Sequence, residues 1–207
     1  MDSDASFNLP ARTPLLIIIS GPAGAGKDTV VRTMMKRGQS FHFVVTATTR
    51  EQRPDEVEGK DYFFVSDAEF DRMVDADELL EHTRVYKQNK GIPRAQVQEA
   101  LASGKDVVMR LDVQGAATVH ALEGNALMIF VTVESEQALE RRLRERKTDT
   151  EEQIAVRMAT AREEMKRIGE YDYVVINRDD HPDEAVDTLE AIIRAEHARV
   201  APRKVQL

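Results

Sequence analysis

Residues 15–29 carry the sequence LLIIISGPAGAGKDT, and this stretch decides the fold. The apolar run Leu15–Ile19 is typical of a strand buried on both faces of a parallel sheet. The next residues, Gly21–Lys27, fit the pattern G-x-x-x-x-G-K and open a helical pattern that continues to about Arg37. A glycine-rich backbone and a helix N-terminus direct several N–H groups at a phosphate, and Lys27 adds a full positive charge. A plain glycine-rich turn is the competing interpretation, but it does not require the lysine. We predict an ATP-binding loop made by Gly21, Pro22, Ala23, Gly24, Ala25, Gly26, Lys27, Asp28 and Thr29.

Asp28 departs from the usual form of this loop, in which a serine or threonine offers its hydroxyl to Mg²⁺. Because Mg²⁺ prefers oxygen ligands, a carboxylate can take that place. One interpretation is that Asp28 binds Mg²⁺ directly or through a water molecule. The other is that Asp28 only caps the helix, where its charge favours the positive end of the helix dipole.

The composition excludes several classes of protein. The chain has 207 residues, which is enough for one domain of ordinary size. Its net charge is −8, which argues against a nucleic-acid or membrane partner, since both need a basic surface. With no cysteine, it has neither disulfides nor thiol chemistry. The start of the chain lacks the basic segment of a signal peptide, so we expect a cytoplasmic protein. Monomer and homodimer both remain open.

Short β-rich segments alternate with helical ones along most of the chain. This alternation predicts an α/β fold in which a parallel sheet is covered by helices on both faces. We assign this domain to residues 14–200, between tails at 1–13 and 201–207. The strands are predicted at residues 15–20, 41–48, 106–113, 127–133 and 171–177, and the helices between them at 93–103, 136–146, 150–168 and 183–199.

The section from about residue 46 to 92 interrupts the alternation. It contains a short apolar segment, Asp61–Val65, and then a helix start at Ser66, with Glu69 three residues later as in a capping box. We therefore predict an inserted subdomain. Its first loop carries Arg50 and Arg53, two arginines that can converge on one anion. Alone this is a weak signal, because charged surface loops are common.

At this point the chain resembles the guanylate kinases of the nucleoside monophosphate kinase superfamily. The resemblance covers about Leu15 to Ala195, and the glycine-lysine-aspartate loop and the GIP element are similar to a branch of plant organellar and some bacterial members. The segments that carry it, in family order, are GPAGAGKD (21–28), TATTREQRPDEVEGKDYFFVSDAEF (46–70), ELLEHTRVY (78–86), GIPRAQVQEALASGKDVVMRLDVQGA (91–116), ERRLRERKTDTEEQIAVRM (140–158) and YDYVVIN (171–177).

The resemblance implies a GMP site in the insertion. Glu81 would accept hydrogen bonds from N1 and N2 of guanine, an edge that adenine lacks. Asp112 would lie near both the base and Mg²⁺. On the residues alone, Tyr62 could instead belong to a core and Glu81 to the surface end of a helix. The implied GMP-binding residues are Thr46, Arg50, Arg53, Tyr62, Glu81, Lys90 and Asp112.

Three residues depart from the family pattern. Lys90 stands where the family usually has a second phosphate-binding tyrosine, and its amine can still donate to phosphate. Ile92 replaces a serine or threonine that contacts the base, and it cannot hydrogen-bond. Arg110 replaces an aspartate, and we expect it either to pair with Asp112 or Glu81 as a structural residue, or to belong to the site.

The resemblance also implies a helical lid over ATP at about residues 136–157. Its arginines Arg142, Arg146 and Arg157 would stabilise charge on the transferring phosphoryl group. The alternative is an amphipathic helix with a solvated basic side. Asn177, which follows the last predicted strand, would contact adenine.

The resulting hypothesis is the Mg²⁺-dependent transfer of a phosphoryl group from ATP to GMP or dGMP, with Lys27, Arg50 and the lid arginines as catalytic residues. Asp28 and Asp112 are the candidate metal ligands. Two alternatives remain: a related P-loop kinase with another phosphorylated acceptor, and a non-catalytic guanylate-kinase-like module that binds protein. The intact phosphate loop argues against the second alternative.

Overall fold

The structure is a computed structural model. It describes residues 11–38, 41–54, 56–85, 88–145, 149–179 and 181–205. Its described residues form two sheets. The strands of the main sheet are β1 (Leu16–Ser20), β2 (Phe41–Phe43), β7 (Asp106–Arg110), β8 (Leu127–Thr132) and β9 (Tyr173–Ile176). Those of the second sheet are β3 (Thr46–Thr48), β4 (Tyr62–Phe64), β5 (Leu79–Val85) and β6 (Gln88–Pro93).

Helices follow most of these strands, as the alternating sequence pattern predicts. They are α1 (Lys27–Lys36), α2 (Asp67–Asp75), α3 (Arg94–Ala102), α4 (Val113–Leu122), α5 (Glu136–Glu145), α6 (Glu151–Met165), the 3-10 helix η1 (Ile168–Glu170) and α7 (Pro182–His197). None of the helices within the described ranges is long and apolar enough to span a membrane.

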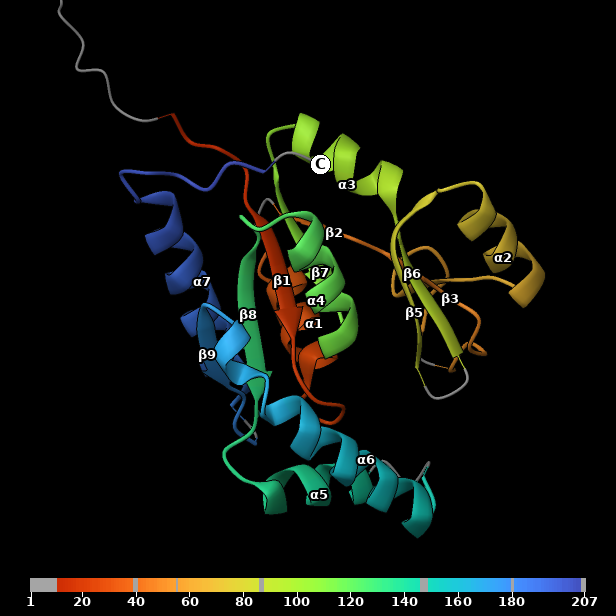
Figure 1. The fold of residues 1–207 in the computed structure, drawn as a ribbon. Helices are drawn as coiled ribbons and strands as arrows, with labels where there is room; N and C mark the ends of the chain where they lie inside the picture. Colours follow the sequence, from red (N-terminus) through yellow and green to blue (C-terminus); the bar gives the residue numbers. More distant parts are fainter. Residues whose placement is uncertain are drawn as a thin grey trace, which may run out of the picture.

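The main sheet has the strand order β2-β7-β1-β8-β9, and all its neighbouring strands pair in parallel. Alternate side chains of β1 feed two different cores. Ile17 and Ile19 pack with α1 and α7 on one face, while Leu16 and Ile18 pack with α3 and α4 on the other. Figure 1 shows β1 in the middle of this layered arrangement. The predicted parallel α/β class is confirmed.

The second sheet lies to one side of the main sheet, with α2 on its outer side (Figure 1). Its strand order is β4-β3-β6-β5, with β3 and β4 parallel and the other neighbours antiparallel. Ala47, Phe70 and Leu79 form its small core. The side chain of Ser66 accepts a hydrogen bond from the backbone of Glu69, so the predicted helix start is confirmed.

The single strand predicted at residues 41–48 is wrong, because this segment divides into β2 and β3, which belong to different sheets. The chain leaves the main sheet after Val44, whose N–H donates to Val108 O at 2.9 Å. The side chain of Gln96 then holds both backbone groups of Val45, accepting from its N–H and donating to its carbonyl. These two hydrogen bonds fix the point at which the chain crosses to the second sheet.

Helices α5 and α6 pack on each other through a separate apolar cluster that includes Leu139, Leu143 and Ile154. They lie below the main sheet in Figure 1. Near the chain ends, Arg12 pairs with Asp106 at 3.1 Å. Arg203, in the segment predicted as the C-terminal tail, is 13% exposed in its side chain and pairs with Glu196 and Asp172.

Candidate active site

A cleft opens where the carboxyl ends of the main-sheet strands face the second sheet and α6. Ligands of open parallel sheets bind at this edge. The phosphate loop borders the cleft on one side and the strands of the inserted section border it on the other. Its lining residues are Gly21, Ala23, Gly24, Gly26, Lys27, Asp28, Thr46, Arg50, Arg53, Tyr62, Glu81, Thr83, Gln88, Lys90, Arg110, Leu111, Asp112, Arg157 and Glu164.

The phosphate loop joins β1 to α1 in a conformation that its glycines permit. Gly21 has φ of 135°, and a Cβ on this residue would lie 2.0 Å from the carbonyl oxygen of Val131. The Lys27 ammonium donates to the carbonyls of Gly21 and Pro22 at 2.5 and 3.0 Å, so the lysine folds back over the loop. Burial lowers the pKa of Lys27 to about 8, while the charges of Asp28 and Glu164 act in the opposite direction.

Asn177 and Arg142 support the phosphate loop through hydrogen bonds to its backbone. The Asn177 side chain is buried and donates to the Ala25 carbonyl at 2.9 Å. The Arg142 guanidinium donates to Ala25 O at 3.2 Å, to Asn177 O at 2.6 Å and to Asp179 Oδ1 at 2.6 Å. Neither Asn177 nor Arg142 lines the cleft. Both therefore hold the loop in this conformation, and the expected contacts of Asn177 with adenine and of Arg142 with the transferring phosphoryl group stay predictions.

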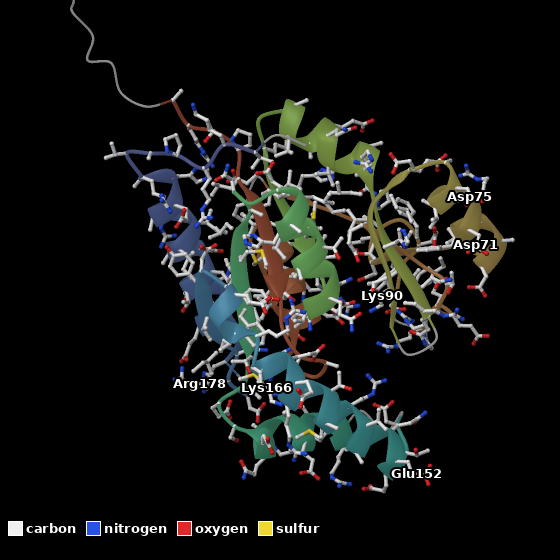
Figure 2. All side chains as sticks on the ribbon, in the orientation of Figure 1. Asp71, Asp75, Lys90, Glu152, Lys166 and Arg178 are labelled. Carbon is white, nitrogen blue, oxygen red and sulfur yellow. The ribbon has the colours of Figure 1, made fainter. Side chains whose placement is uncertain are left out.

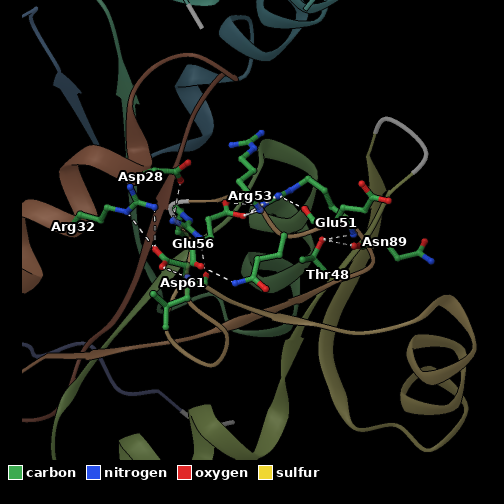
Figure 3. A network of polar contacts seen from close by, with 12 residues as sticks. Asp28, Arg32, Thr48, Glu51, Arg53, Glu56, Asp61 and Asn89 are labelled. Atoms are coloured by element: carbon green, nitrogen blue, oxygen red, sulfur yellow. Dashed lines mark hydrogen bonds and ion pairs between the residues drawn. The ribbon is translucent and has the colours of Figure 1, made fainter. Parts of the chain in front are cut away.

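Opposite the loop, Arg50 is held in place by a buried carboxylate. Its two terminal nitrogens donate to the Glu56 oxygens at 2.9 and 2.7 Å, and the Arg53 backbone N–H donates to Glu56 at 2.9 Å. Burial acts to raise the pKa of Glu56, but the hydrogen bonds from Arg50 and Arg53 outweigh it, and the net shift of the pKa is downward. The guanidinium carbon of Arg50 lies 5.2 Å from the centre of the Tyr62 ring. Figure 3 shows Glu56 and Arg53 within this network.

Glu81 extends from β5 into the cleft, and the described residues do not fully satisfy the hydrogen-bonding capacity of its carboxyl group. The residue is 3% exposed, and its Oε1 has no hydrogen-bond partner among the described residues. Burial raises the pKa of Glu81 to about 8, and the charge of Asp112 adds to this shift. A Cβ on Gly115 would lie 2.9 Å from Oε1, so α4 leaves just enough room for the carboxylate.

Lys90 and Thr83 also reach the cleft from the second sheet, where they are register partners in β6 and β5. Figure 2 shows Lys90 on the side of the second sheet that faces the main sheet, whereas Asp71 and Asp75 lie on the outer helix α2. Burial lowers the pKa of Lys90, with Asp112 acting against this shift. Lys90 thus adds a cation to the wall that carries Arg50.

Arg110 pairs with a partner that the sequence does not suggest. Its Nη1 lies 2.9 Å from Asp28 Oδ1, so the expected pairing with Asp112 or Glu81 is wrong. The physical reason is the position of Arg110 at the carboxyl end of β7, next to β1 and hence beside the first turn of α1. The Asp112 side chain instead accepts hydrogen bonds from the Gln114 and Gly115 backbone and caps α4.

Comparisons with known proteins identify the arrangement. A family model described as guanylate kinase matches residues 13–196. The chain belongs to the guanylate kinase family. It is 48% identical to guanylate kinase 2, chloroplastic/mitochondrial, of Oryza sativa subsp. japonica, over 96% of this chain and 70% of that protein. It is 42% identical to the guanylate kinase of Caldanaerobacter subterraneus subsp. tengcongensis, over 92% and 91%. The crystal structure of guanylate kinase from Anaplasma phagocytophilum matches with a TM-score of 0.75 and 27% identity, over 91% of this chain and 89% of that one.

For a guanylate kinase, the carboxylates of the cleft fit a Mg²⁺ ion that arrives with the nucleotide. No group of three or more ligating side chains that could hold a metal occurs among the residues the structure describes. Asp28 and Asp112 nevertheless line the same cleft beside the phosphate loop. One or two carboxylates, completed by substrate phosphates and water, make a common protein environment for Mg²⁺. Asp28 lies in the first turn of α1, after the N-cap residue Gly26, so its charge also favours the positive end of the helix dipole and both interpretations of Asp28 stay open.

Most of the residues predicted for this guanylate kinase site meet in the cleft, but several do not. Pro22, Ala25 and Thr29 belong to the phosphate loop and the first turn of α1, but they do not line the cleft. Asn177 and Arg142 contact the loop from other parts of the chain, and they do not line the cleft either. Arg157 does line it and pairs with Asp149 at 3.1 Å. The predicted catalytic Arg146 lies outside the described residues.

Sequence reasoning missed three polar residues that line the cleft, Thr83, Gln88 and Glu164. Thr83 and Glu81 are two positions apart in β5, so a strand assignment for this segment would have placed both on one face. Glu164 lies on α6, and its Oε2 is buried without a hydrogen-bond partner among the described residues. Burial raises the pKa of Glu164, while the charge of Lys27 opposes this shift.

Proposed function

We propose that this guanylate kinase transfers the γ-phosphoryl group of ATP to the phosphate of GMP or dGMP, giving ADP and GDP or dGDP. One observation carries the choice of acceptor: the buried carboxylate of Glu81, whose Oε1 has no partner among the described residues. A buried polar atom of this kind is costly unless a ligand satisfies it. The carboxylate lies across the cleft from a loop built for phosphate.

Guanine fits this carboxylate because its N1–H and N2–H groups form a pair of parallel donors. A carboxylate accepts from both, whereas adenine offers no such pair on the corresponding edge. Thr46 and Thr83 also line the cleft, and their hydroxyls can accept or donate. Thr83, two residues after Glu81 in β5, is a candidate for the hydroxyl contact with the base that the apolar side chain of Ile92 cannot make.

The chemistry requires alignment and neutralisation of charge more than a catalytic base. An oxygen of the GMP phosphate, already ionised at neutral pH, attacks the γ-phosphorus, and the bond from that phosphorus to the β-γ bridging oxygen breaks. Lys27 and the loop amides hold the ATP phosphates, while Arg50, Arg53 and Tyr62 hold the acceptor phosphate. When bound, Mg²⁺ neutralises charge on the β- and γ-phosphates, with Asp28 and Asp112 as its candidate protein ligands.

We further propose that two parts of the 14–200 domain close over the substrates. The insertion at about residues 46–92 carries the GMP site, and the lid at about 136–157 carries Arg157 into the cleft. Closure expels water, which would otherwise compete with GMP as the acceptor. Arg142 and Asn177 contribute by fixing the phosphate loop through the Ala25 carbonyl, and the contact of Asn177 with adenine stays a prediction. Arg146 stays a prediction of a further lid cation.

The decisive test is a coupled assay of ADP release with ATP, Mg²⁺ and each of GMP, dGMP, AMP, UMP and CMP. We expect activity with GMP and dGMP and little with the others. Glu81→Ala should reduce kcat/KM for GMP at least about 100-fold and change ATP affinity less than about threefold, because only the base loses its partner. Glu99→Ala, which alters an exposed glutamate of α3, is the matched control. Equal turnover of AMP and GMP by the unmodified chain would refute the assignment.

A cytoplasmic location and a monomeric or homodimeric state also belong to this proposal. Imaging of the tagged chain in its own cells tests the first. Light scattering at assay concentrations tests the second. Neither result bears on the chemistry above.

A further inference from the structure

Arg110 occupies a position between the two halves of the cleft. It lies at the end of β7, its side chain is 15% exposed, and it lines the cleft. Its guanidinium carbon is 4.8 Å from the centre of the Tyr62 ring, and Arg50 contacts the same ring at 5.2 Å. Two guanidinium groups therefore flank the one tyrosine that the proposed function places at the acceptor phosphate.

The contacts of Arg110 within the described residues leave it able to bind a further anion. Its Nη1 pairs with Asp28, and its Nη2 makes a long hydrogen bond of 3.4 Å to the backbone carbonyl of Asp61. An arginine carries five N–H donors in a rigid planar fork, more than these two contacts use. The fork is thus held in place and still has donors for an acceptor inside the cleft.

The ion pair with Asp28 holds the Arg110 guanidinium near the ATP loop. Asp28 follows Lys27 in the first turn of α1, so the Asp28–Arg110 pair connects the ATP loop to the tyrosine of the acceptor side. Asp28 is about half exposed, whereas the Arg110 side chain is mostly buried, so the pair extends from the wall of the cleft to its opening. A second ion pair of the same network, Arg32 with Asp61 at 3.1 Å, lies beside it, as Figure 3 shows. Arg32 does not line the cleft.

We propose that Arg110 is a third phosphate-binding arginine of the acceptor subsite, and that Asp28 is the positioning residue that directs it there. The inference rests on the proposed function and extends it to a residue for which the sequence suggested another partner. An acceptor monophosphate brings a doubly charged group into a partly desolvated cleft. Arginine forks bind such groups with charge-assisted hydrogen bonds. Arg110 adds one cation on the side of the acceptor phosphate that faces ATP.

The test compares the binding of GMP with that of guanosine, by calorimetry on the full chain without ATP. Removing a phosphate contact weakens only GMP, whereas damage to the fold weakens both ligands. We expect Arg110→Met to raise the Kd for GMP about 10- to 100-fold and that for guanosine less than twofold. Arg32→Met is the matched control, since it removes an arginine and an ion pair of the same network. It should leave both Kd values within about twofold.

The positioning role of Asp28 is tested by a double-mutant cycle. Asp28→Asn should raise the Kd for GMP about 3- to 10-fold, and the double variant should be no weaker than Arg110→Met alone, because Asp28 acts through Arg110. Fully additive effects would overturn this role. An Arg110→Met variant with unchanged GMP affinity, or with equal losses for GMP and guanosine, would overturn the phosphate contact. If Arg110→Met fails to fold, Arg110→Gln, which also removes the charge, replaces it in the same comparison with the same expected and contradicting results.

The same titrations separate this inference from the proposed function. If the unmodified chain binds AMP as tightly as GMP, the guanine assignment fails. In that case the comparison of each nucleotide with its nucleoside still decides whether Arg110 contacts the phosphate.

Discussion

The raised pKa of Glu81 makes GMP binding dependent on pH. Burial raises this pKa to about 8, so at neutral pH the free protein holds a proton on Glu81. Only the ionised carboxylate accepts both guanine donors, and the proton must therefore leave when GMP binds. Each pH unit below 8 reduces the ionised fraction tenfold, which weakens GMP binding by about 100-fold, or about 2.7 kcal/mol, at pH 6.

Glu81→Gln is the perturbation that isolates this effect. The amide keeps one acceptor oxygen but replaces the other with a donor, so we expect a loss of about 2–3 kcal/mol, or roughly 30- to 150-fold in GMP affinity, near pH 8. The variant has no carboxylate to titrate. The phosphate of GMP also titrates, near pH 6, but it does so equally in both proteins. The ratio of the two affinities should therefore shrink to a few-fold at pH 6.

Calorimetry in buffers of different ionisation enthalpy measures the proton directly. At pH 7 the native chain should release close to one proton more per GMP than Glu81→Gln does. Glu99→Gln, at an exposed position of α3, should behave like the native chain. A ratio of affinities that stays constant from pH 6 to pH 9, or equal proton release by both proteins, would refute the reasoning.

The raised pKa of Glu81 also makes the free energy of unfolding depend on pH. Because the folded pKa of Glu81 is raised from its ordinary value of 4.5 to about 8, the folded state holds a proton that the unfolded chain loses between these values. The contribution of Glu81 to stability is thus full below about pH 4.5 and declines until about pH 8. Relative to Glu81→Gln, the native chain should lose up to roughly 5 kcal/mol of unfolding free energy over this range, measured by urea denaturation.

Three further outcomes follow from the contacts described above. Gly21→Ala should abolish ATP binding or folding, measured by nucleotide titration and circular dichroism, because its Cβ would meet the Val131 carbonyl at 2.0 Å; near-native binding would contradict this. Arg142→Met should raise KM for ATP about tenfold with KM for GMP nearly unchanged, since it braces only the phosphate loop, and equal changes in both would contradict the brace. Gln96→Ala should lower the unfolding free energy by about 1–3 kcal/mol in urea because both backbone groups of Val45 lose a partner, and an unchanged midpoint would contradict that role.

The sequence predicted the fold where local patterns carry it. The apolar run before the phosphate loop became the central strand β1, and the Ser66 pattern became a capped helix start. The prediction failed where contacts between residues distant in the sequence determine the local structure. The strand predicted at 41–48 overlapped the start of the predicted insertion at about residue 46, and the hydrogen bonds that fix the crossing come from Gln96, about 50 residues away. The hairpin of β5 and β6 was missed because its charged residues line a cleft instead of facing solvent.

The site shows the same division between local and distant information. The phosphate loop is contiguous, so its residues could be listed from the sequence. Asp28 and Arg110 each depart from the family pattern, and no local pattern indicates that the two departures belong together. The structure brings them within 2.9 Å, because β7 is the parallel neighbour of β1 and the loop begins where β1 ends. A charge introduced on one element is thus matched by a charge on its neighbour.

In the free chain, several ionisable groups of the cleft are buried without the partners that the two substrates would supply. Burial lowers the pKa of Lys27 and Lys90, and buried carboxylate oxygens of Glu81 and Glu164 have no hydrogen-bond partner within the described residues. ATP phosphates beside Lys27 would favour its charged form, and guanine would satisfy Glu81. Each substrate thus satisfies groups that the other does not reach: the ATP phosphates pair with Lys27, and guanine pairs with Glu81. The buried groups of the cleft are therefore best paired in the complex that holds both nucleotides, which is the complex in which transfer takes place.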